Sequence, residues 1–302
     1  MTTFNLAEHL GIACPSPEQS VSPDWHHAGD YQLSVKRDDL LHPHISGNKW
    51  RKLKYALTNY LSDEIKELVS FGGGYSNHLH ALAYACSKLN IELTAIVRGN
   101  YQNNLTPMLK DIMQWGTKVQ FVDRAFYQQR YDAIFLDELR LQHPGAEIVP
   151  EGGSQQAALQ GVQEVITELQ HNYDYILAPV GSGGTLAGLI AAQTPAKILG
   201  IAVLKGQAYL EQLVTQLLPV NNIQDNWQIH HDYHCGGYAK RSPELIAFCE
   251  SFCQAHAIPL EPVYSGKLFF AAKQLVEQQW FPAGSRILLL HTGGLQGNRR
   301  IG

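Results

Sequence analysis

Lys49 stands in a run of residues that could support covalent chemistry, Ile45-Ser-Gly-Asn-Lys-Trp-Arg-Lys-Leu53. It follows a Ser-Gly-Asn turn, and apolar residues from Trp50 onward recur at the spacing of one helix face. We expect Asn48 or Ser46 to cap this helix. A lysine amine held at a helix start can reach a neighbouring site and form a Schiff base with an aldehyde cofactor.

A simpler interpretation of the same run is a solvated basic surface. Four basic residues lie close together here: Lys49, Arg51, Lys52 and Lys54. Such a cluster is usually a helix face exposed to water. The run alone therefore leaves both interpretations open, and the rest of the chain must decide between them.

A second stretch, Pro179-Val-Gly-Ser-Gly-Gly-Thr185, lies between a predicted strand and a predicted helix. Backbone N–H groups at a helix start, helped by the hydroxyls of Ser182 and Thr185, can hold a phosphate. A dinucleotide fingerprint would need glycine where Leu186 stands, and a Walker loop would need Gly-Lys-Ser/Thr. The stretch favours a single phosphate on a molecule smaller than a nucleotide, with a ligand-free tight turn as the alternative. A lysine together with a phosphate loop suggests pyridoxal phosphate.

Six blocks of the sequence belong together. They are Val35-Lys-Arg-Asp-Asp-Leu40, Ser46-Gly-Asn-Lys-Trp-Arg-Lys-Leu53, Phe71-Gly-Gly-Gly-Tyr-Ser-Asn-His78, Gly181-Ser-Gly-Gly-Thr185, Pro262-Val-Tyr-Ser-Gly-Lys267 and His291-Thr-Gly-Gly294. In this order the chain resembles the D-cysteine desulfhydrase / 1-aminocyclopropane-1-carboxylate deaminase family. That family belongs to the tryptophan-synthase-β-like enzymes (fold type II), so the resemblance implies pyridoxal 5'-phosphate as the cofactor.

The resemblance also implies which residues bind that cofactor. Lys49 is expected to carry it as a Schiff base and later to remove the α-proton of the substrate. Asn77 is expected to hydrogen-bond its 3-hydroxyl and Thr292 to face its pyridine nitrogen. Five consecutive residues are expected to hold its phosphate: Gly181, Ser182, Gly183, Gly184 and Thr185.

A further set of residues is implied for the substrate. Ser76 is expected to meet the substrate carboxylate or to assist proton transfer, with Asn77 and His78 beside it. Tyr264 is expected to line the substrate side of the ring, and Tyr238 to approach the site. Other roles are open: Ser76 and Asn77 could cap the helix that begins near His78, Tyr264 could be a core aromatic, and Thr292 could satisfy a turn.

Other groups of titratable residues give weaker signals. His230, His231, His234 and Cys235 lack a recognisable metal-ligand spacing, so we expect no metal site there. His78 and His80 are two residues apart and should point to different faces of a helix. Cys249 and Cys253 lie one helical turn apart and are expected in the core.

The composition describes an ordinary globular chain of 302 residues, with 45% hydrophobic and 17% charged residues. A net charge of −4 argues against a nucleic-acid or anionic-membrane partner. Five cysteines without a paired spacing indicate a reduced, cytoplasmic protein. We expect no signal peptide and no membrane span.

The elements that must position these residues alternate along the chain. Up to about Leu41 the chain reads as irregular, apart from one strand. We expect strands at 31–36, 67–71, 93–97, 119–122, 147–149, 175–180, 198–204 and 287–290. Helices are expected at 78–89, 107–115, 131–142, 155–169, from 186, at 243–256 and at 268–279.

This alternation predicts an α/β protein with open parallel sheets covered by helices on both faces. Glycine-rich loops at 72–74, 181–184 and 293–294 each follow a strand, and ligands of open parallel sheets bind beyond the carboxyl ends of strands. We therefore expect one cleft to collect all three loops. Pro150-Glu-Gly-Gly153 marks a break. It divides the chain into a larger cofactor-binding domain, 1–50 and 151–302, and a smaller α/β domain, 51–150.

The resemblance implies a lyase or deaminase that acts on a small amino acid by α-proton removal and β-elimination. By analogy with the family, a homodimer is expected. D-Cysteine, giving pyruvate, ammonia and sulfide, is the favoured substrate. The alternatives are 1-aminocyclopropane-1-carboxylate deamination, racemisation on the same cofactor, and a non-catalytic carrier or regulator that binds pyridoxal phosphate.

One departure from the ring-opening deaminases bears on this choice. In them a tyrosine is expected just before the last His-x-Gly-Gly, with an acidic partner for the ring nitrogen, whereas this chain has Leu288, Leu289, Leu290 and Thr292. The sequence also ends soon after the motif, at Gly302, so C-terminal elements of longer relatives are expected to be missing.

Overall fold

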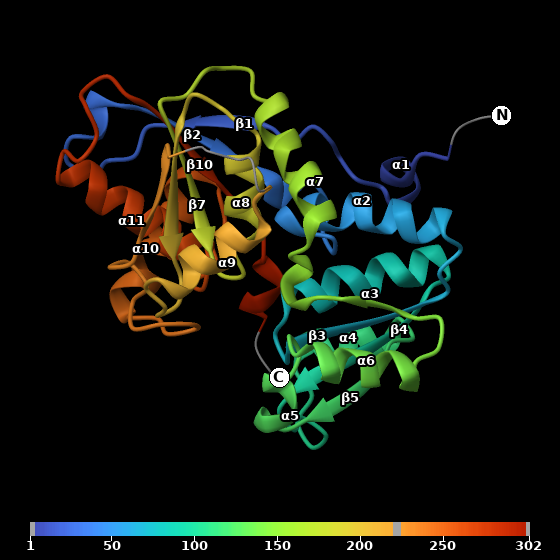
Figure 1. The fold of residues 1–302 in the computed structure, drawn as a ribbon. Coiled ribbons are helices and arrows are strands. Elements are labelled where there is room, and N and C mark those ends of the chain that lie inside the picture. The colour runs from blue at the N-terminus through green and yellow to red at the C-terminus, as the bar shows by residue number, and fades with distance from the viewer. Residues whose placement is uncertain (1–3, 220–224, 300–302) are drawn as a thin grey trace.

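The computed structural model describes residues 4–219 and 225–299 and contains two sheets (Figure 1). The six-stranded sheet has the order β1 (Glu18–Val21), β2 (Gln32–Lys36), β10 (Arg286–Leu290), β7 (Tyr175–Val180), β8 (Lys197–Ala202) and β9 (Trp227–His230). The four-stranded sheet has the order β5 (Lys118–Val122), β4 (Glu92–Arg98), β3 (Glu67–Gly73) and β6 (Glu147–Val149). All neighbours pair in parallel except β1, which runs antiparallel to β2.

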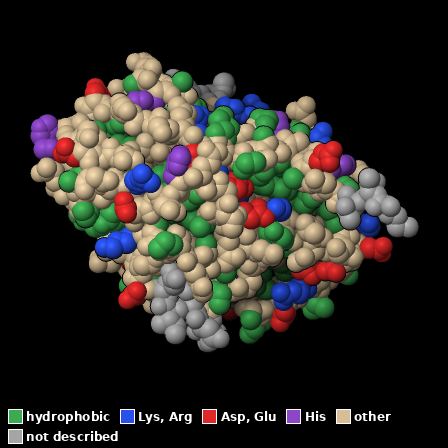
Figure 2. Space-filling model, turned by 90° about the horizontal axis from the view of Figure 1, so that it is seen from above, with side chains coloured by type: hydrophobic (Ala, Val, Ile, Leu, Met, Phe, Trp, Pro, Cys, Tyr) green, Lys and Arg blue, Asp and Glu red, His purple; other side chains and the backbone are tan. Residues whose placement is uncertain are grey.

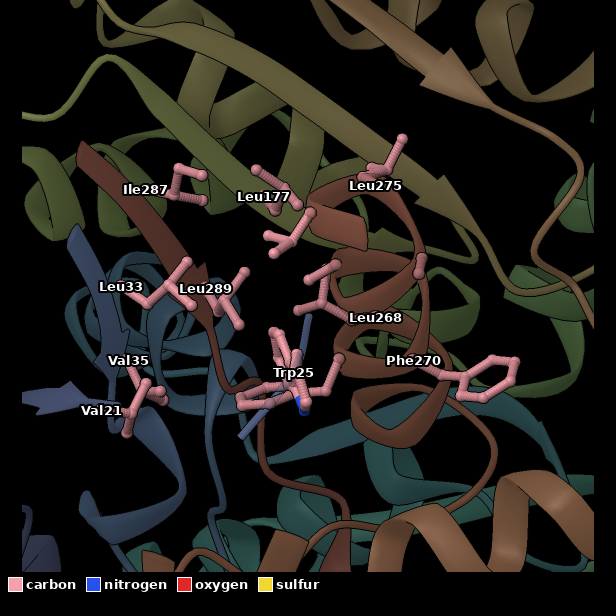
Figure 3. Packing of buried hydrophobic residues seen from close by; sticks show 14 of the residues in the cluster. Val21, Trp25, Leu33, Val35, Leu177, Leu268, Phe270, Leu275, Ile287 and Leu289 are labelled. Atoms are coloured by element: carbon pink, nitrogen blue, oxygen red, sulfur yellow. The ribbon is translucent and has the colours of Figure 1, made fainter. Parts of the chain in front are cut away.

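The central strands β10, β7 and β8 of the large sheet are buried on both faces, which explains their continuous apolar runs. In β10, Ile287 and Leu289 pack with α10 (Pro243–His256) and α11 (Ser265–Glu277) in one hydrophobic cluster. Leu288 and Leu290 point to the opposite face, where α7 (Gln156–Thr167), α8 (Gly184–Ala191) and α9 (Tyr209–Leu217) cover the sheet. Figure 3 shows the first of these clusters, with Leu33 and Leu289 from adjacent strands side by side.

The small sheet is layered in the same way. One face packs against α2 (Asn48–Ser62), α3 (Asn77–Leu89) and α4 (Pro107–Gln114). The other face packs against α5 (Arg124–Gln128) and α6 (Ala133–Gln142) through Tyr127, Phe135 and Leu139. The predicted α/β class, with helices on both faces of parallel sheets, is confirmed.

Helix α2 joins the two halves. Its apolar face packs in the cluster of the small sheet, and it also lies against α7 of the large sheet. Arg51 is fully buried there and pairs with Asp38 at 2.9 Å and with Glu168 at 2.5 Å. Since Asp38 follows β2 and Glu168 follows α7, this buried network fixes α2 relative to the large sheet. The division into two domains at residues 50 and 150 stays a prediction.

The opening segment was expected to be irregular apart from one strand, and this is wrong in part. It contains α1 (Leu6–Leu10), capped by the Asn5 side chain, and the edge strand β1. In β1 only Val21 is buried, so the strand lacks the apolar run of the central strands. Helices α5 and α9 and strand β9 were also not predicted, and α8 begins at Gly184 instead of residue 186. Short 3-10 turns complete the fold: Ala28–Asp30, Asp38–Leu40, Glu151–Gly153 and Leu295–Asn298 (η4).

The surface agrees with the small net charge. In the face shown in Figure 2, basic and acidic side chains lie interspersed among hydrophobic ones. Within the described residues, no helix is both long and apolar enough to span a bilayer.

Candidate active site

Lys49 is the second residue of α2, and the backbone around it is held from the other end of the chain. Gly47 precedes the helix with φ 60° and ψ −135°, a conformation open essentially to glycine. A Cβ at Gly47 would collide with the Thr292 carbonyl group, to which the Asn48 N–H donates at 3.3 Å. The turn before Lys49 therefore fits directly against the loop after β10.

Neither Ser46 nor Asn48 caps α2, so that expectation is wrong. Gly47 occupies the cap position without a side chain. Asn48 Nδ2 instead donates to Thr185 Oγ1 at 2.7 Å, and Ser46 Oγ accepts from the Gly294 N–H at 3.4 Å. Asn48 thus connects the Lys49 turn to the loop at 181–185, and Ser46 connects it to the loop at 293–294. Three segments that are distant in the sequence converge in this way.

Burial lowers the pKa of the Lys49 amine to about 8. Within the described residues it has no hydrogen-bond or ion-pair partner among the side chains. An amine with a pKa near neutrality has a substantial nucleophilic fraction in ordinary buffers and can also accept a proton. These properties are compatible with the predicted Schiff-base lysine, and the role of Lys49 stays a prediction.

The glycine loop follows β7 and leads into α8. Gly183 has φ 80°, so this position favours glycine. A Cβ at Gly184 would lie 2.8 Å from Ser154 Oγ and 3.1 Å from Lys52 Nζ. Side chains larger than hydrogen would fill the space between this loop and α2, which explains the run of small residues.

Lys52 is the residue that the sequence reasoning missed. One of the two interpretations of the basic run placed it on a solvated helix face, but Lys52 is 1% exposed and Arg51 0%. Lys52 Nζ donates to Ser154 Oγ at 2.7 Å and to Ser182 Oγ at 3.2 Å, and within the described residues it pairs with no carboxylate. A buried ammonium group without a counter-ion, beside backbone N–H groups at a helix start, fits a phosphate group. Its position three residues after Lys49 was the signal that could have found it.

Ser76 and Asn77 lie where β3 passes into α3. Ser76 caps α3 by accepting the Leu79 N–H at 3.2 Å, which confirms the capping role. Its hydroxyl proton remains free to be donated. Asn77 is the first residue of the helix, and a Cβ at Gly294 would lie 2.8 Å from Asn77 Nδ2. The loop after β3 thereby meets the loop after β10.

His78 is buried, and its tautomer follows from its neighbours. Ser70 Oγ donates to the Val149 carbonyl at 2.8 Å, so it must accept from His78 Nε2, also at 2.8 Å. Burial, followed by the charges of Lys49 and Lys52, lowers the pKa of His78 well below its usual value. The ring is therefore neutral with the proton on Nε2. Its Nδ1, which has no partner among the described residues, is an acceptor near Gly153.

Tyr264 lies against the glycine loop, where a Cβ at Gly181 would be 3.2 Å from its ring. Its hydroxyl donates to that of Tyr238 at 3.4 Å. Tyr238 itself is half exposed, so it lies at the outer side of this pair. Burial raises the pKa of Tyr264 well above its usual value, which keeps the hydroxyl protonated.

Two buried charged residues hold these tyrosines. Glu261 accepts from the N–H groups of Val263, Tyr264 and Ser265 at 2.6–2.8 Å and so fixes the turn that carries Tyr264. Lys267 Nζ donates to the carbonyl groups of Val203 and Gly237 at 3.0 and 2.8 Å, which anchors the loop of Tyr238. Tyr264 thus lies against the glycine loop and outside the main hydrophobic clusters, and its role toward the substrate stays a prediction.

Thr292 is 6% exposed, and its carbonyl holds the turn before Lys49. His291 beside it accepts from the Gly293 N–H at 3.1 Å and contacts the Pro259 carbonyl at 2.7 Å. Contacts of Gly47, Asn48 and Gly294 therefore hold the Lys49 turn next to Thr292, the glycine loop and Asn77. Tyr264 lies on the glycine loop and Tyr238 further out.

The weaker candidates lie elsewhere. His231 pairs with Glu211 at 2.6 Å, and His230 ends β9. His78 and His80 have different partners, because His80 contacts Asp111 at 3.0 Å. Cys249 is buried, Cys253 is half-buried, and all five cysteines are free. Among the described residues, no group of three or more histidine, cysteine or acidic residues could hold a metal ion.

Comparison with known families bears on the lysine and the phosphate loop. Residues 21–293, which include every segment of the site, match the model of the family described as "Pyridoxal-phosphate dependent enzyme". The chain belongs to this family. Members depend on pyridoxal phosphate, and the fold is that of its type II enzymes. The chain is therefore a pyridoxal-phosphate-dependent enzyme, as its sequence blocks predicted.

Curated relatives narrow the position of the chain within the family. A putative 1-aminocyclopropane-1-carboxylate deaminase of Pyrococcus horikoshii is 30% identical over 281 residues, covering 89% of this chain and 86% of the relative. A D-cysteine desulfhydrase of Klebsiella pneumoniae is 27% identical over 322 residues, covering 97% of this chain and 95% of the relative. The crystal structure of a homologue of ACC (1-aminocyclopropane-1-carboxylate) deaminase matches with a TM-score of 0.80 at 26% identity. The match covers 97% of this chain and 95% of that chain. The chain therefore belongs with the enzymes of this lyase and deaminase group.

Proposed function

We propose that the enzyme removes the α-proton of a small amino acid and eliminates its β-substituent. The preferred substrate is D-cysteine, which with water gives pyruvate, ammonia and sulfide. The observation that carries this proposal is the buried, unpartnered amine of Lys49, with its lowered pKa, on the same helix as the buried Lys52. Relatives named for D-cysteine desulfhydration support the choice of substrate.

The residues present fit pyridoxal phosphate. The phosphate would be held by residues 181–185 and Lys52, the 3-hydroxyl by Asn77, and the pyridine nitrogen would face Thr292. When bound, the cofactor supplies an aldehyde that condenses with amines and a ring that accepts the electron pair of the broken Cα–H bond.

The other residues act on the substrate. The Lys49 amine takes the α-proton. Because burial lowers its pKa to about 8, the amine is largely unprotonated above pH 8 and can accept that proton. The Ser76 oxygen already accepts the Leu79 N–H, so its O–H group is free to donate a hydrogen bond to the substrate carboxylate. Asn77 and His78 form the same wall, and Tyr264 covers the substrate side of the ring with Tyr238 next to it.

Thr292 favours elimination over reactions that need a long-lived carbanion. A carboxylate beside the pyridine nitrogen would stabilise the protonated ring, whereas a neutral threonine hydroxyl donates to an unprotonated nitrogen and makes the ring a weaker electron acceptor. A β-substituent that leaves quickly is then an advantage. This argues against racemisation as the main reaction.

The second candidate reaction is opening of the ring of 1-aminocyclopropane-1-carboxylate, after which relatives are named. Against it stands the strand before His291, because Leu288, Leu289 and Leu290 are fully buried in the core and bring no hydroxyl to the site. Membership in a family of pyridoxal-phosphate-dependent enzymes argues against the carrier or regulator without turnover.

The experiment supplies purified holoenzyme with D-cysteine, L-cysteine, β-chloro-D-alanine, D-alanine and 1-aminocyclopropane-1-carboxylate. Pyruvate, 2-oxobutanoate, sulfide and α-proton exchange are followed. We expect pyruvate from D-cysteine and β-chloro-D-alanine at the highest rates. Predominant 2-oxobutanoate from the cyclopropane substrate, or fast racemisation of D-alanine with little pyruvate, would replace the proposal by the corresponding alternative. Absence of any product would refute the proposed reaction.

The setting of the reaction is also a proposal. The family resemblance supports a homodimer, and the five free cysteines are compatible with a reducing cytoplasm. Light scattering of the purified protein would test the first, and fractionation of cells that express it the second.

A further inference from the structure

Gln296 touches Asn77 from the end of the described chain. It lies in η4, directly after the loop that carries Thr292. Its Nε2 donates to Asn77 Oδ1 at 2.6 Å and to the Tyr75 carbonyl at 3.2 Å. Figure 1 shows this red segment running from the large sheet down between the two halves, toward the start of α3.

The orientation of the Gln296 amide is fixed at both ends. The guanidinium group of Arg299 can only donate, and it contacts Gln296 Oε1 at 3.2 Å. The carbonyl group of Tyr75 can only accept, so the atom that faces it must be the Gln296 nitrogen. If the Gln296 amide were flipped, its oxygen would face the Tyr75 carbonyl oxygen and its nitrogen would face the Arg299 guanidinium group. Neither pair could form a hydrogen bond.

This orientation decides which atom Asn77 presents to the site. Since the Gln296 nitrogen donates to Asn77, the atom of Asn77 that faces it is Oδ1. The Asn77 Nδ2 group is left over, and it has no hydrogen-bond partner among the described residues. It lies beside Gly294, where any side chain would displace it.

Arg299 is itself held on the small-sheet side of the molecule. Its NH2 group lies 2.6 Å from Asp111 Oδ2, which also contacts His80 Nε2 at 3.0 Å. The Arg299 Nε donates to the Gln296 carbonyl at 3.2 Å. Helices α3 and α4 therefore hold η4, and η4 holds the Asn77 amide.

We propose that Gln296 is a positioning residue that keeps the Asn77 NH2 group directed at the ring oxygen of the cofactor. A donor in that place stabilises the oxygen as a deprotonated acceptor. This inference rests on the proposed function in one respect, the assumption that Asn77 binds the ring oxygen of the cofactor. Gln296 itself lies outside the six sequence blocks.

The test measures the affinity of the cofactor-free protein for pyridoxal phosphate by absorbance titration, without substrate. Gln296→Met keeps the length and removes the donor, so the Kd should rise by about 2- to 10-fold, the effect of one hydrogen bond. Gln296→Glu should raise the Kd further, because two acceptor oxygens would turn the Asn77 amide around. In both variants the visible absorbance band of the bound cofactor should shift. Gln142→Glu, on the exposed end of α6, is the matched control for the added charge and should leave Kd and band unchanged.

The decisive comparison repeats Gln296→Met in an Asn77→Ala background. If Gln296 acts through Asn77, the loss of affinity should disappear there. An equal loss in both backgrounds, or an unchanged Kd and band in Gln296→Met alone, would overturn the proposal. If Gln296→Met does not fold, Gln296→Glu carries the same comparison.

The outcome is separable from that of the proposed function. If the protein binds pyridoxal phosphate but releases no product from D-cysteine, the proposed reaction is wrong. The binding comparison still decides the role of Gln296 in that case. An Asn77→Ala variant with wild-type affinity would overturn the role of Asn77, and the role of Gln296 with it.

Discussion

Replacing Lys52 by methionine should stabilise the cofactor-free protein and weaken its binding of pyridoxal phosphate. The ammonium group is buried with two hydroxyl partners, which contribute about 1 kcal/mol each. Burying a charge without a counter-ion costs several kcal/mol. The Ser154 and Ser182 hydroxyls are 2.7 Å apart, so they keep each other as partners after the change. We expect the free energy of unfolding to rise by about 1–3 kcal/mol.

Cofactor binding should change in the opposite direction. A hydrogen bond between an ammonium group and a phosphate contributes about 1.5–3 kcal/mol, so its loss should raise the Kd by about 10- to 100-fold. The assays are urea unfolding of the cofactor-free protein and titration with pyridoxal phosphate. Lys54→Met is the control on the same helix. Lys54 pairs with Glu164 at 2.5 Å, so its loss should leave the Kd unchanged and should not stabilise the fold.

The pH dependence gives a third observable. Burial lowers the pKa of Lys52 in the folded protein, so the unfolded chain binds this proton more tightly. The stability of the cofactor-free protein should therefore rise as pH increases from the folded-state pKa of Lys52 toward 10.5, and Lys52→Met should remove this part of the rise. Lower stability of Lys52→Met together with an unchanged Kd would refute the reasoning, since Lys52 would then be a structural residue.

Further predictions concern the chemistry of Lys49, Ser76 and Thr292. Lys49→Ala should abolish turnover and the visible band of the lysine-bound cofactor, and borohydride reduction of the wild type should attach the cofactor to Lys49; an adduct on Lys52 or Lys54 would contradict this. In the cofactor-free protein, acylation of Lys49 should accelerate as pH rises through about 8, because only the neutral amine reacts. Ser76→Ala should lose about 0.5–2 kcal/mol of stability with the helix cap and also most of its turnover; wild-type turnover would leave Ser76 as a cap alone. Thr292→Glu should slow elimination relative to α-proton exchange, and an unchanged partition between the two would show that Thr292 does not face the ring nitrogen.

The sequence predicted the central strands well because their residues are buried on both faces. Strand β7 spans the predicted residues 175–180, and β10 extends beyond its predicted range, 287–290, by Arg286 alone. The edge elements lack this signal. In β1 a single buried valine follows three polar residues, so its pairing with β2 decides its conformation rather than its own residues.

The site was predicted as far as local motifs reach. The glycine loops, Lys49 and the Ser76 cap follow from neighbouring residues. Lys52 and Arg51 could not be told from a solvated face, because what buries them comes from distant segments: Ser154 and Ser182 for Lys52, Asp38 and Glu168 for Arg51. Gln296 was invisible for the same reason.

The position of β10 in the large sheet has a consequence for synthesis. This strand, residues 286–290, inserts between β2 and β7, which do not pair with each other. A nascent chain that has not yet released residue 290 from the ribosome therefore carries two unjoined half-sheets, with the apolar side chains of Leu33, Val35 and Leu177 lacking Ile287 and Leu289. Gly47 also lacks the Thr292 carbonyl against which the Lys49 turn fits. The large sheet and the Lys49 turn can therefore close only after residues 286–292 have left the ribosome, and until then the apolar side chains of its central strands stay exposed.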